Sequence, residues 1–212
     1  RVKDKSKLGD LYIRMVAITA LIVLPIFMGL AAIADPFVTV AFGEKFAPSA
    51  EFMTISAFTM YPSVIAWFLP NLLISDAKTR DAFRLTLLNV FTNIGVAGAT
   101  IWFGIEVMLI SLVVSSFVFL PLKLFIVTRH IPINIRKLGK ALVPSFLASL
   151  GMFLTLLELK GLLSSVVPND VVLLCCLIFT GALIYPLFLF VVFHQYTRGQ
   201  MTELKEMLSK KK

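Results

Sequence analysis

The chain has 212 residues, a mean hydropathy of +0.93 and only 15% charged residues, where a soluble domain has about a quarter. This composition excludes a water-soluble enzyme, a disordered tail and a secreted disulfide scaffold, since the only two cysteines, Cys175 and Cys176, are adjacent in an apolar run. The net charge of +8 therefore raises the question of which side of a membrane carries it.

Six apolar runs are long enough, or nearly so, to cross about 30 Å of hydrocarbon as helices. Only Arg14 brings a charge into these runs, near the start of the first, where a long side chain can reach the interface. Residues 171–178 do not alternate apolar with polar, which excludes strands of a membrane barrel. The sequence predicts an all-α polytopic membrane helix bundle with six transmembrane helices, at 11–33, 52–75, 85–103, 107–122, 141–157 and 171–193.

Basic residues fall almost entirely on one side of this predicted bundle. The segment 1–10, the start of the first span, the loops after the second and fourth spans and the tail 194–212 carry all but two of the 20 Lys and Arg. The opposite loops hold only Lys45 and Lys160. By the positive-inside rule, both termini are expected to be cytoplasmic, with anionic lipid headgroups rather than nucleic acid as the contact.

The amino-terminal part has the basic residues, apolar stretch and small-residue site, Ala32-Ile33-Ala34, of a secretory signal peptide. Its apolar stretch is longer than usual and five more spans follow, so we expect a membrane span instead. Residue 1 is Arg and not Met, and we therefore expect a fragment that begins in a cytoplasmic loop of a longer protein.

The first predicted span is followed by a second, shorter apolar segment. Asp35 precedes Pro36, and a residue before proline is pushed out of helical geometry, which predicts a helix stop there. The six apolar residues from Phe37 to Phe42 are too few to span a membrane. We expect them to form a short interfacial helix that ends at Gly43.

Two stretches resemble the bacterial polysaccharide flippases, whose superfamily also contains the multidrug and toxin extrusion transporters and the lipid II flippases. From Leu24 to Ala50, a helix with proline and glycine closes in Ala-Asp-Pro and continues as Phe-Gly-Glu-Lys-Phe-Ala-Pro-Ser-Ala, with Phe46 where the family usually has Trp. From Leu73 to Asp81, the sequence is similar to a short cytoplasmic loop of the family, in which a Gly often stands near Ala77.

This resemblance implies a transporter of two helical lobes, of which the chain is the carboxy-terminal one and the missing amino-terminal lobe is a partner. Such proteins move undecaprenyl-diphosphate-linked oligosaccharides across the bacterial inner membrane for lipopolysaccharide or exopolysaccharide biosynthesis. They do so by alternating access around a polar, often cationic cavity.

Polar side chains recur within one sector of the third span, at Thr86, Asn89, Asn93 and Thr100, and the second span carries Ser56, Thr59 and Ser63 on one side. Such faces meet either a water-filled cavity or another helix, and hydrogen bonds between helices are the simpler alternative. At the cytoplasmic mouth, cationic side chains can meet a diphosphate or merely lipid headgroups, and Arg84 is expected to face the cavity. The candidate substrate-binding residues are Arg80, Arg84, Asn89, Asn93 and Lys123.

Enzyme motifs are missing from the sequence. There is no P-loop, nucleophile elbow or zinc-binding motif, and His130 and His194 stand alone at predicted membrane boundaries. We therefore expect no enzyme, and no catalytic residue, metal or cofactor. Two other classes stay open: half of a major-facilitator or multidrug-exporter transporter, and a membrane polysaccharide polymerase or ligase. The latter usually has a large periplasmic loop, whereas the longest outer loop here has about a dozen residues.

Overall fold

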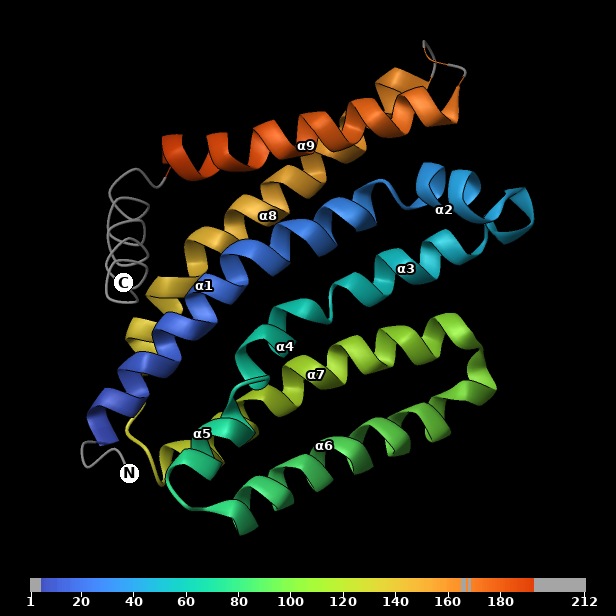
Figure 1. Ribbon diagram of the computed structural model, residues 1–212. Helices are drawn as coiled ribbons and strands as arrows, with labels where there is room; N and C mark the ends of the chain where they lie inside the picture. Colours follow the sequence, from blue (N-terminus) through green and yellow to red (C-terminus); the bar gives the residue numbers. More distant parts are fainter. Residues whose placement is uncertain (1–4, 165–166, 168, 193–212) are drawn as a thin grey trace.

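The computed structural model describes residues 5–164, 167 and 169–192, and Figure 1 shows the arrangement of its helices. Every regular element among these residues is helical. The elements are α1 (Lys5–Ala32), α2 (Ala34–Phe42), η1 (Glu44–Phe46), α3 (Ser49–Ala57), α4 (Met60–Ala66), α5 (Leu69–Ser75), α6 (Thr79–Thr100), η2 (Ile101–Phe103), α7 (Ile105–Thr128), α8 (Ile135–Ser164) and α9 (Asp170–Val192). The predicted tail, residues 194–212, lies outside the described residues, as do residues 1–4.

The helices have the lengths and composition of a membrane bundle. Five of them are long and apolar enough to cross a membrane, and a sixth crossing forms if α3 and the segment 60–75, bent by 43° against it, count as one span. The predicted all-helical membrane bundle is thus confirmed. Helices α7 and α8 extend beyond the predicted spans 107–122 and 141–157, because a helix keeps its own backbone hydrogen bonds after its side chains become polar.

The break after the first long helix lies two residues earlier than the sequence predicts. Helix α1 ends at Ala32 and α2 begins at Ala34, so Asp35 and Pro36 occupy the first turn of α2 and do not stop a helix. In a first turn the amide groups have no helical partner, so a proline loses nothing and an acidic residue is favoured there. Helix α2 ends at Gly43, whose φ is +90°, as expected.

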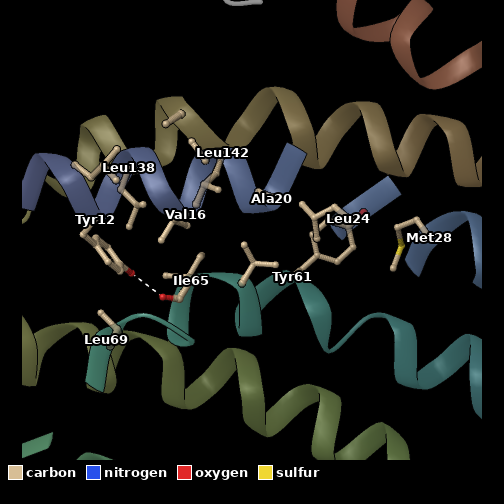
Figure 2. Close-up of a cluster of buried hydrophobic side chains, with 14 of the residues drawn as sticks. Tyr12, Val16, Ala20, Leu24, Met28, Tyr61, Ile65, Leu69, Leu138 and Leu142 are labelled. Carbon is tan, nitrogen blue, oxygen red and sulfur yellow. Dashed lines mark hydrogen bonds between the residues drawn. The ribbon is translucent and has the colours of Figure 1, made fainter. Parts of the chain in front are cut away.

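Helix α1 is the centre of the bundle. Figure 2 shows its side chains at every fourth position, beginning with Tyr12 and ending with Met28, between α8 on one side and α4 on the other. These side chains are almost completely buried, and Ala20 in the middle of the row leaves room for the neighbouring helices to approach. Leu138 and Leu142 cover this row from α8.

Hydroxyl groups from other helices satisfy backbone carbonyls at the helix breaks. Pro25 in α1 has no N–H, so the carbonyl of Leu21, four residues earlier, has no amide partner within its helix. The Tyr185 hydroxyl of α9 donates to this carbonyl at 2.8 Å. A membrane interior offers no water to such a carbonyl, so the hydrogen bond from Tyr185 offsets the one that Pro25 cannot make.

Hydroxyl groups bond to backbone carbonyls beside two further helix breaks. The Tyr12 hydroxyl donates at 2.7 Å to the carbonyl of Ile65, at the end of α4 (Figure 2). The Thr54 hydroxyl of α3 donates at 3.1 Å to the carbonyl of Ala31, just before the break between α1 and α2. Both bonds join α1 to the broken segment that follows it in the sequence.

Charged side chains join the start of α1 to α8 and to two loops at one end of the bundle. Lys5 at the start of α1 forms an ion pair with Asp76 at 2.8 Å and donates to the carbonyl of His130 at 3.2 Å. Lys137 of α8 reaches Asp10 of α1 at 3.4 Å. The loops with most of the described Lys and Arg thus share this end, which we call the basic end, and the end with α2, η1, η2 and the start of α9 is the far end (Figure 1).

The turn between α5 and α6 has a left-handed residue that is not glycine. Ala77 has a φ of +61°, the amide of Lys78 donates to the carbonyl of Leu73 at 2.9 Å, and that of Ala77 donates to the carbonyl of Ile74 at 2.9 Å. This pattern is a Schellman turn, which usually has glycine at the left-handed position. The flippase loop that this stretch resembles often has that glycine; here an alanine adopts the left-handed conformation at an energetic cost.

We predict that Ala77→Gly stabilises the protein by about 0.5–1 kcal/mol, because glycine removes the strain of the left-handed conformation but adds freedom to the unfolded chain. The thermal unfolding midpoint in detergent micelles measures the effect. Ala99→Gly in the last turn of α6 is the control with the opposite sign, expected to destabilise by less than the roughly 1 kcal/mol that glycine costs in a helix interior. A loss of stability in both variants contradicts the strained turn.

We also predict that Tyr185→Phe destabilises the protein by about 1 kcal/mol, through loss of the hydrogen bond to Leu21. In a Pro25→Ala background the same substitution should cost much less, because the alanine that replaces the proline supplies the amide that the carbonyl lacks. Unfolding of the four proteins in a double-mutant cycle measures the coupling. Equal losses in both backgrounds would show that the hydroxyl does not serve the proline.

Candidate functional site

A polar pocket of about 300 Å³ lies between the α4–α5 segment and the α6–α7 hairpin. Figure 1 shows these helices together in the lower half of the bundle, away from α9. The pocket brings together three of the five predicted site residues, which come from two different helices. Its lining consists of Pro62, Ser63, Ala66, Trp67, Pro70, Leu85, Thr86, Asn89, Asn93, Ser116 and Lys123.

The central contact of the pocket is a hydrogen bond between two predicted site residues. The Lys123 ammonium of α7 donates to the side-chain oxygen of Asn89 in α6 at 2.7 Å. Lys123 is half-buried and lies five residues before the end of α7, about 7.5 Å along the helix axis from the basic end. The bond leaves ammonium protons for a further acceptor, since a lysine can donate three hydrogen bonds.

Asn93 lines the same pocket one turn beyond Asn89, so the polar wall extends along α6. It lies 14 residues into the helix, about 20 Å from its start. Both asparagine side chains are exposed in this chain. Their predicted shared face is therefore turned toward the pocket and does not serve only as a contact between packed helices.

The opposite wall is formed where the second predicted span is broken. Helix α4 ends at Ala66 and α5 begins at Leu69, and Pro70 has no amide to donate to the carbonyl of Ala66. Trp67 lies in this break and is exposed toward the pocket. The break between α4 and α5 at Pro70 thus lies at the wall of the pocket.

The hydroxyl groups around the pocket are mostly bonded within their own helices. Thr86 donates to the carbonyl of Ala82 at 3.1 Å, and Ser116 to the carbonyl of Leu112 at 2.8 Å. Their oxygens can still accept hydrogen bonds. Of the other hydroxyl-bearing residues that the sequence singles out, Ser63 lines the pocket, whereas the lining does not include Ser56, Thr59 or Thr100.

The two predicted arginines lie outside the lining, at the basic end. Arg80 is exposed in the first turn of α6. The Arg84 side chain is 71% exposed and contacts Asp81 at 3.4 Å, and Asp81 also lies 3.4 Å from the imidazole of His130. A role of either arginine in substrate binding stays a prediction.

Sequence reasoning missed Trp67 and Ser116 as pocket residues. Trp67 stands between Pro62 and Pro70, so a tryptophan flanked by two prolines within an apolar run was an available signal. Ser116 lies in a Ser-Ser pair within the apolar helix α7, which also indicates a polar site within the membrane. Neither signal alone indicates which helix forms the opposite wall of the pocket.

The lining residues can bind but offer little for catalysis. Lys123 supplies positive charge, the asparagines supply donors and acceptors, and Trp67 adds a broad apolar face with an indole N–H. Among the described residues that line the pocket, none has a carboxylate, imidazole or thiol. The arrangement therefore suits an anionic, hydroxyl-rich ligand more than an acid–base reaction.

Comparison with known proteins gives one match. Residues 1–51 of the 212 match the model of a family described as "Polysaccharide biosynthesis protein". No curated protein and no solved structure matches the chain. The matched part covers α1, α2, η1 and the start of α3, and it includes the first of the two stretches that resemble the flippases. It connects this part of the chain with polysaccharide biosynthesis.

We predict that the pocket contains water when the protein is in a bilayer. In a background with Cys175 and Cys176 replaced by serine, Asn93→Cys should react with a membrane-impermeant thiol reagent several times faster than Ile94→Cys. The reason is that the reactive thiolate forms only where water reaches the sulfur. Ile94 is a matched control, since it is the next residue of α6, is exposed, and does not line the pocket. Equal rates at the two positions would contradict a water-filled pocket.

Proposed function

We propose that this chain is part of a transporter in the bacterial inner membrane that moves undecaprenyl-diphosphate-linked oligosaccharides outward for surface polysaccharide biosynthesis. Two observations support the proposal: the family match of residues 1–51, and the resemblance of residues 24–50 and 73–81 to the polysaccharide flippases. The basic end then faces the cytoplasm, because positively charged loops are retained on that side.

The hydrogen bond between Lys123 and Asn89 inside the polar pocket is the observation that carries this proposal. A lysine in a membrane helix is costly, and such residues commonly mark the path of a polar substrate. On this proposal, the ammonium of Lys123 binds the diphosphate, while Asn93 and Trp67 contact the sugars. The position of Lys123 near the basic end suits a substrate that enters from the cytoplasm.

The exposure of α6 supports a second lobe across the pocket. Of the five membrane helices, α6 has the smallest buried share and the lowest mean hydropathy. A helix of this kind does not face hydrocarbon along its whole length, because its asparagines would lack partners there. We propose that an amino-terminal lobe of the same protein faces α6 and that rocking of the two lobes gives alternating access.

The same pocket argues for transport without a chemical step. A polymerase or ligase needs a general base or a nucleophile beside the sugar, and the described lining residues offer only an ammonium, amides, hydroxyls and an indole. We therefore propose that the protein is not an enzyme and that it needs no cofactor. Its partners on this proposal are the lipid-linked oligosaccharide and the surrounding lipids.

We predict that Lys123→Gln lowers export of surface polysaccharide about tenfold, because an uncharged amide replaces a charge-assisted hydrogen bond to the diphosphate. Lys123→Arg, which keeps the charge, should retain more export. The measurement is surface polysaccharide in cells that lack the chromosomal copy and express each variant at equal abundance.

Arg136→Gln is the matched control, because it removes an exposed positive charge at the same end of the bundle but outside the pocket. Its export should equal that of the unmodified protein. If the Lys123→Gln variant exports as much polysaccharide as the unmodified protein, the pocket is not the substrate-binding site. If Lys123→Gln and Arg136→Gln lose export equally, the effect belongs to membrane orientation and not to the pocket.

A further inference from the structure

Two cavities lie one above the other on the side of the bundle formed by α1, α8 and α9. The first, which we call the apolar groove, has about 400 Å³ and an almost entirely apolar lining. Both long helices beside it have a proline in its lining, Pro25 in α1 and Pro186 in α9. The small residue Ala182 of α9 also lines the groove and is exposed. An apolar cavity of about 150 Å³ already holds a benzene ring, so this groove has room for part of a hydrocarbon chain.

The second cavity, which we call the polar cup, has about 280 Å³ and lies at the far end. Its polar groups are Asp35 and Thr39 of α2, Lys160 and Ser164 of α8, and Asp170 at the start of α9. Lys160 forms an ion pair with Asp35 at 2.5 Å. Among the described residues, Asp170 has no cationic partner. The cup therefore has two carboxylates and one ammonium. Asp35 pairs with the ammonium of Lys160, and the Asp170 carboxylate leaves the cup with a net negative charge.

The cup continues the groove on each of its three walls. Ile33 lines the groove and Asp35, two residues later, lines the cup. On α8, Leu156 lines the groove and Lys160 the cup, one helical turn further on. On α9, which runs the other way, Leu177 lines the groove and Leu173 the cup. The two cavities are thus stacked along the helices, with the polar one toward the far end.

This side of the bundle has the character of a surface that faces lipid. Helix α9 is among the most apolar of the membrane helices, whereas α6 beside the polar pocket is the least apolar. Phe179 and Leu183 of α9 are more than 70% exposed and lie beside residues of the groove. In a multi-pass membrane protein, such an apolar exposed face is in contact with hydrocarbon.

We propose that the groove and the cup together bind one bilayer phospholipid whose headgroup has both a phosphate and a primary ammonium, as in phosphatidylethanolamine. One acyl chain lies in the groove against Ala182. In the cup, Lys160 donates to the phosphate with the protons that Asp35 does not use, and the Asp170 carboxylate accepts from the ammonium. The Asp170 carboxylate favours a headgroup that has an ammonium, whereas a purely anionic headgroup would bring its negative charge against both Asp35 and Asp170.

The test for the acyl chain uses the intact protein in phosphatidylcholine nanodiscs with a small amount of phosphatidylethanolamine that has a photoreactive diazirine on one acyl chain. The label should be recovered in peptides that contain 25–33, 152–156 and 177–186. Ala182→Phe fills the groove and should remove most of this label. Leu183→Phe, which adds the same ring at the adjacent exposed position outside the groove, should keep it. Equal labelling of the two variants overturns the groove as the binding site.

The test for the headgroup is competition with unlabelled lipids. Phosphatidylethanolamine should displace the label at lower concentration than phosphatidylcholine, whose ammonium has no N–H, or phosphatidylglycerol, which has no ammonium. Asp170→Asn should weaken competition by phosphatidylethanolamine about tenfold, which is the factor for one charge-assisted hydrogen bond. Lys45→Gln changes a charge at the far end but outside the cup, and it should leave the competition unchanged.

Equal competition by the three lipids overturns the headgroup assignment. A protein helix could fill the groove instead. In that case the Ala182→Cys variant would form a disulfide with a cysteine placed on that helix, and the photoreactive lipid would not label the groove. The measurements do not depend on export, so they separate this proposal from the assignment of the polar pocket.

Discussion

A backbone carbonyl that loses its helical partner inside a membrane needs another donor, because hydrocarbon supplies none. This constraint governs how the bundle can bend. At each of three positions beside a helix break or a proline, a hydroxyl from a different element donates to the carbonyl. The bonds run from Tyr185 to Leu21, from Tyr12 to Ile65 and from Thr54 to Ala31. The interactions that permit the breaks are therefore also those that hold α9 and the α3–α5 segment against α1.

The breaks in turn create the cavities. Because the segment from α3 to α5 is bent and interrupted, Trp67 and the two prolines on either side of it leave a recess opposite α6, and the pocket with Lys123 fills that recess. On the other side of α1, Pro25 and Pro186 both line the apolar groove. A bundle of straight helices with the same composition would pack its side chains into both spaces.

The sequence predicts composition-driven features well and pairings between helices poorly. The apolar runs indicate all the membrane helices, and the polar sector of α6 identifies Asn89 and Asn93 as pocket residues before any contact is known. Lys123 is among the predicted candidates and lines the pocket, but its bond to Asn89 depends on the register of the α6–α7 hairpin. Likewise, Pro25 shows that a carbonyl is freed, whereas the choice of Tyr185 as its partner depends on how α9 packs, which no local pattern contains.

The distribution of ion pairs bears on which parts of the bundle can move. Among the described residues, the ion pair that connects the α5–α6 turn to α1 joins Lys5 to Asp76 at the basic end, and Asp81 meets His130 at the same end. At the far end, the described ion pair between Lys160 and Asp35 joins α8 to α2 and does not involve the hairpin. Trp102 and Phe103 at the hairpin tip are highly exposed. The described ion pairs of the basic end thus lie where the hairpin meets the neighbouring loops, whereas the tip residues Trp102 and Phe103 are largely exposed and bury little surface against the rest of the bundle.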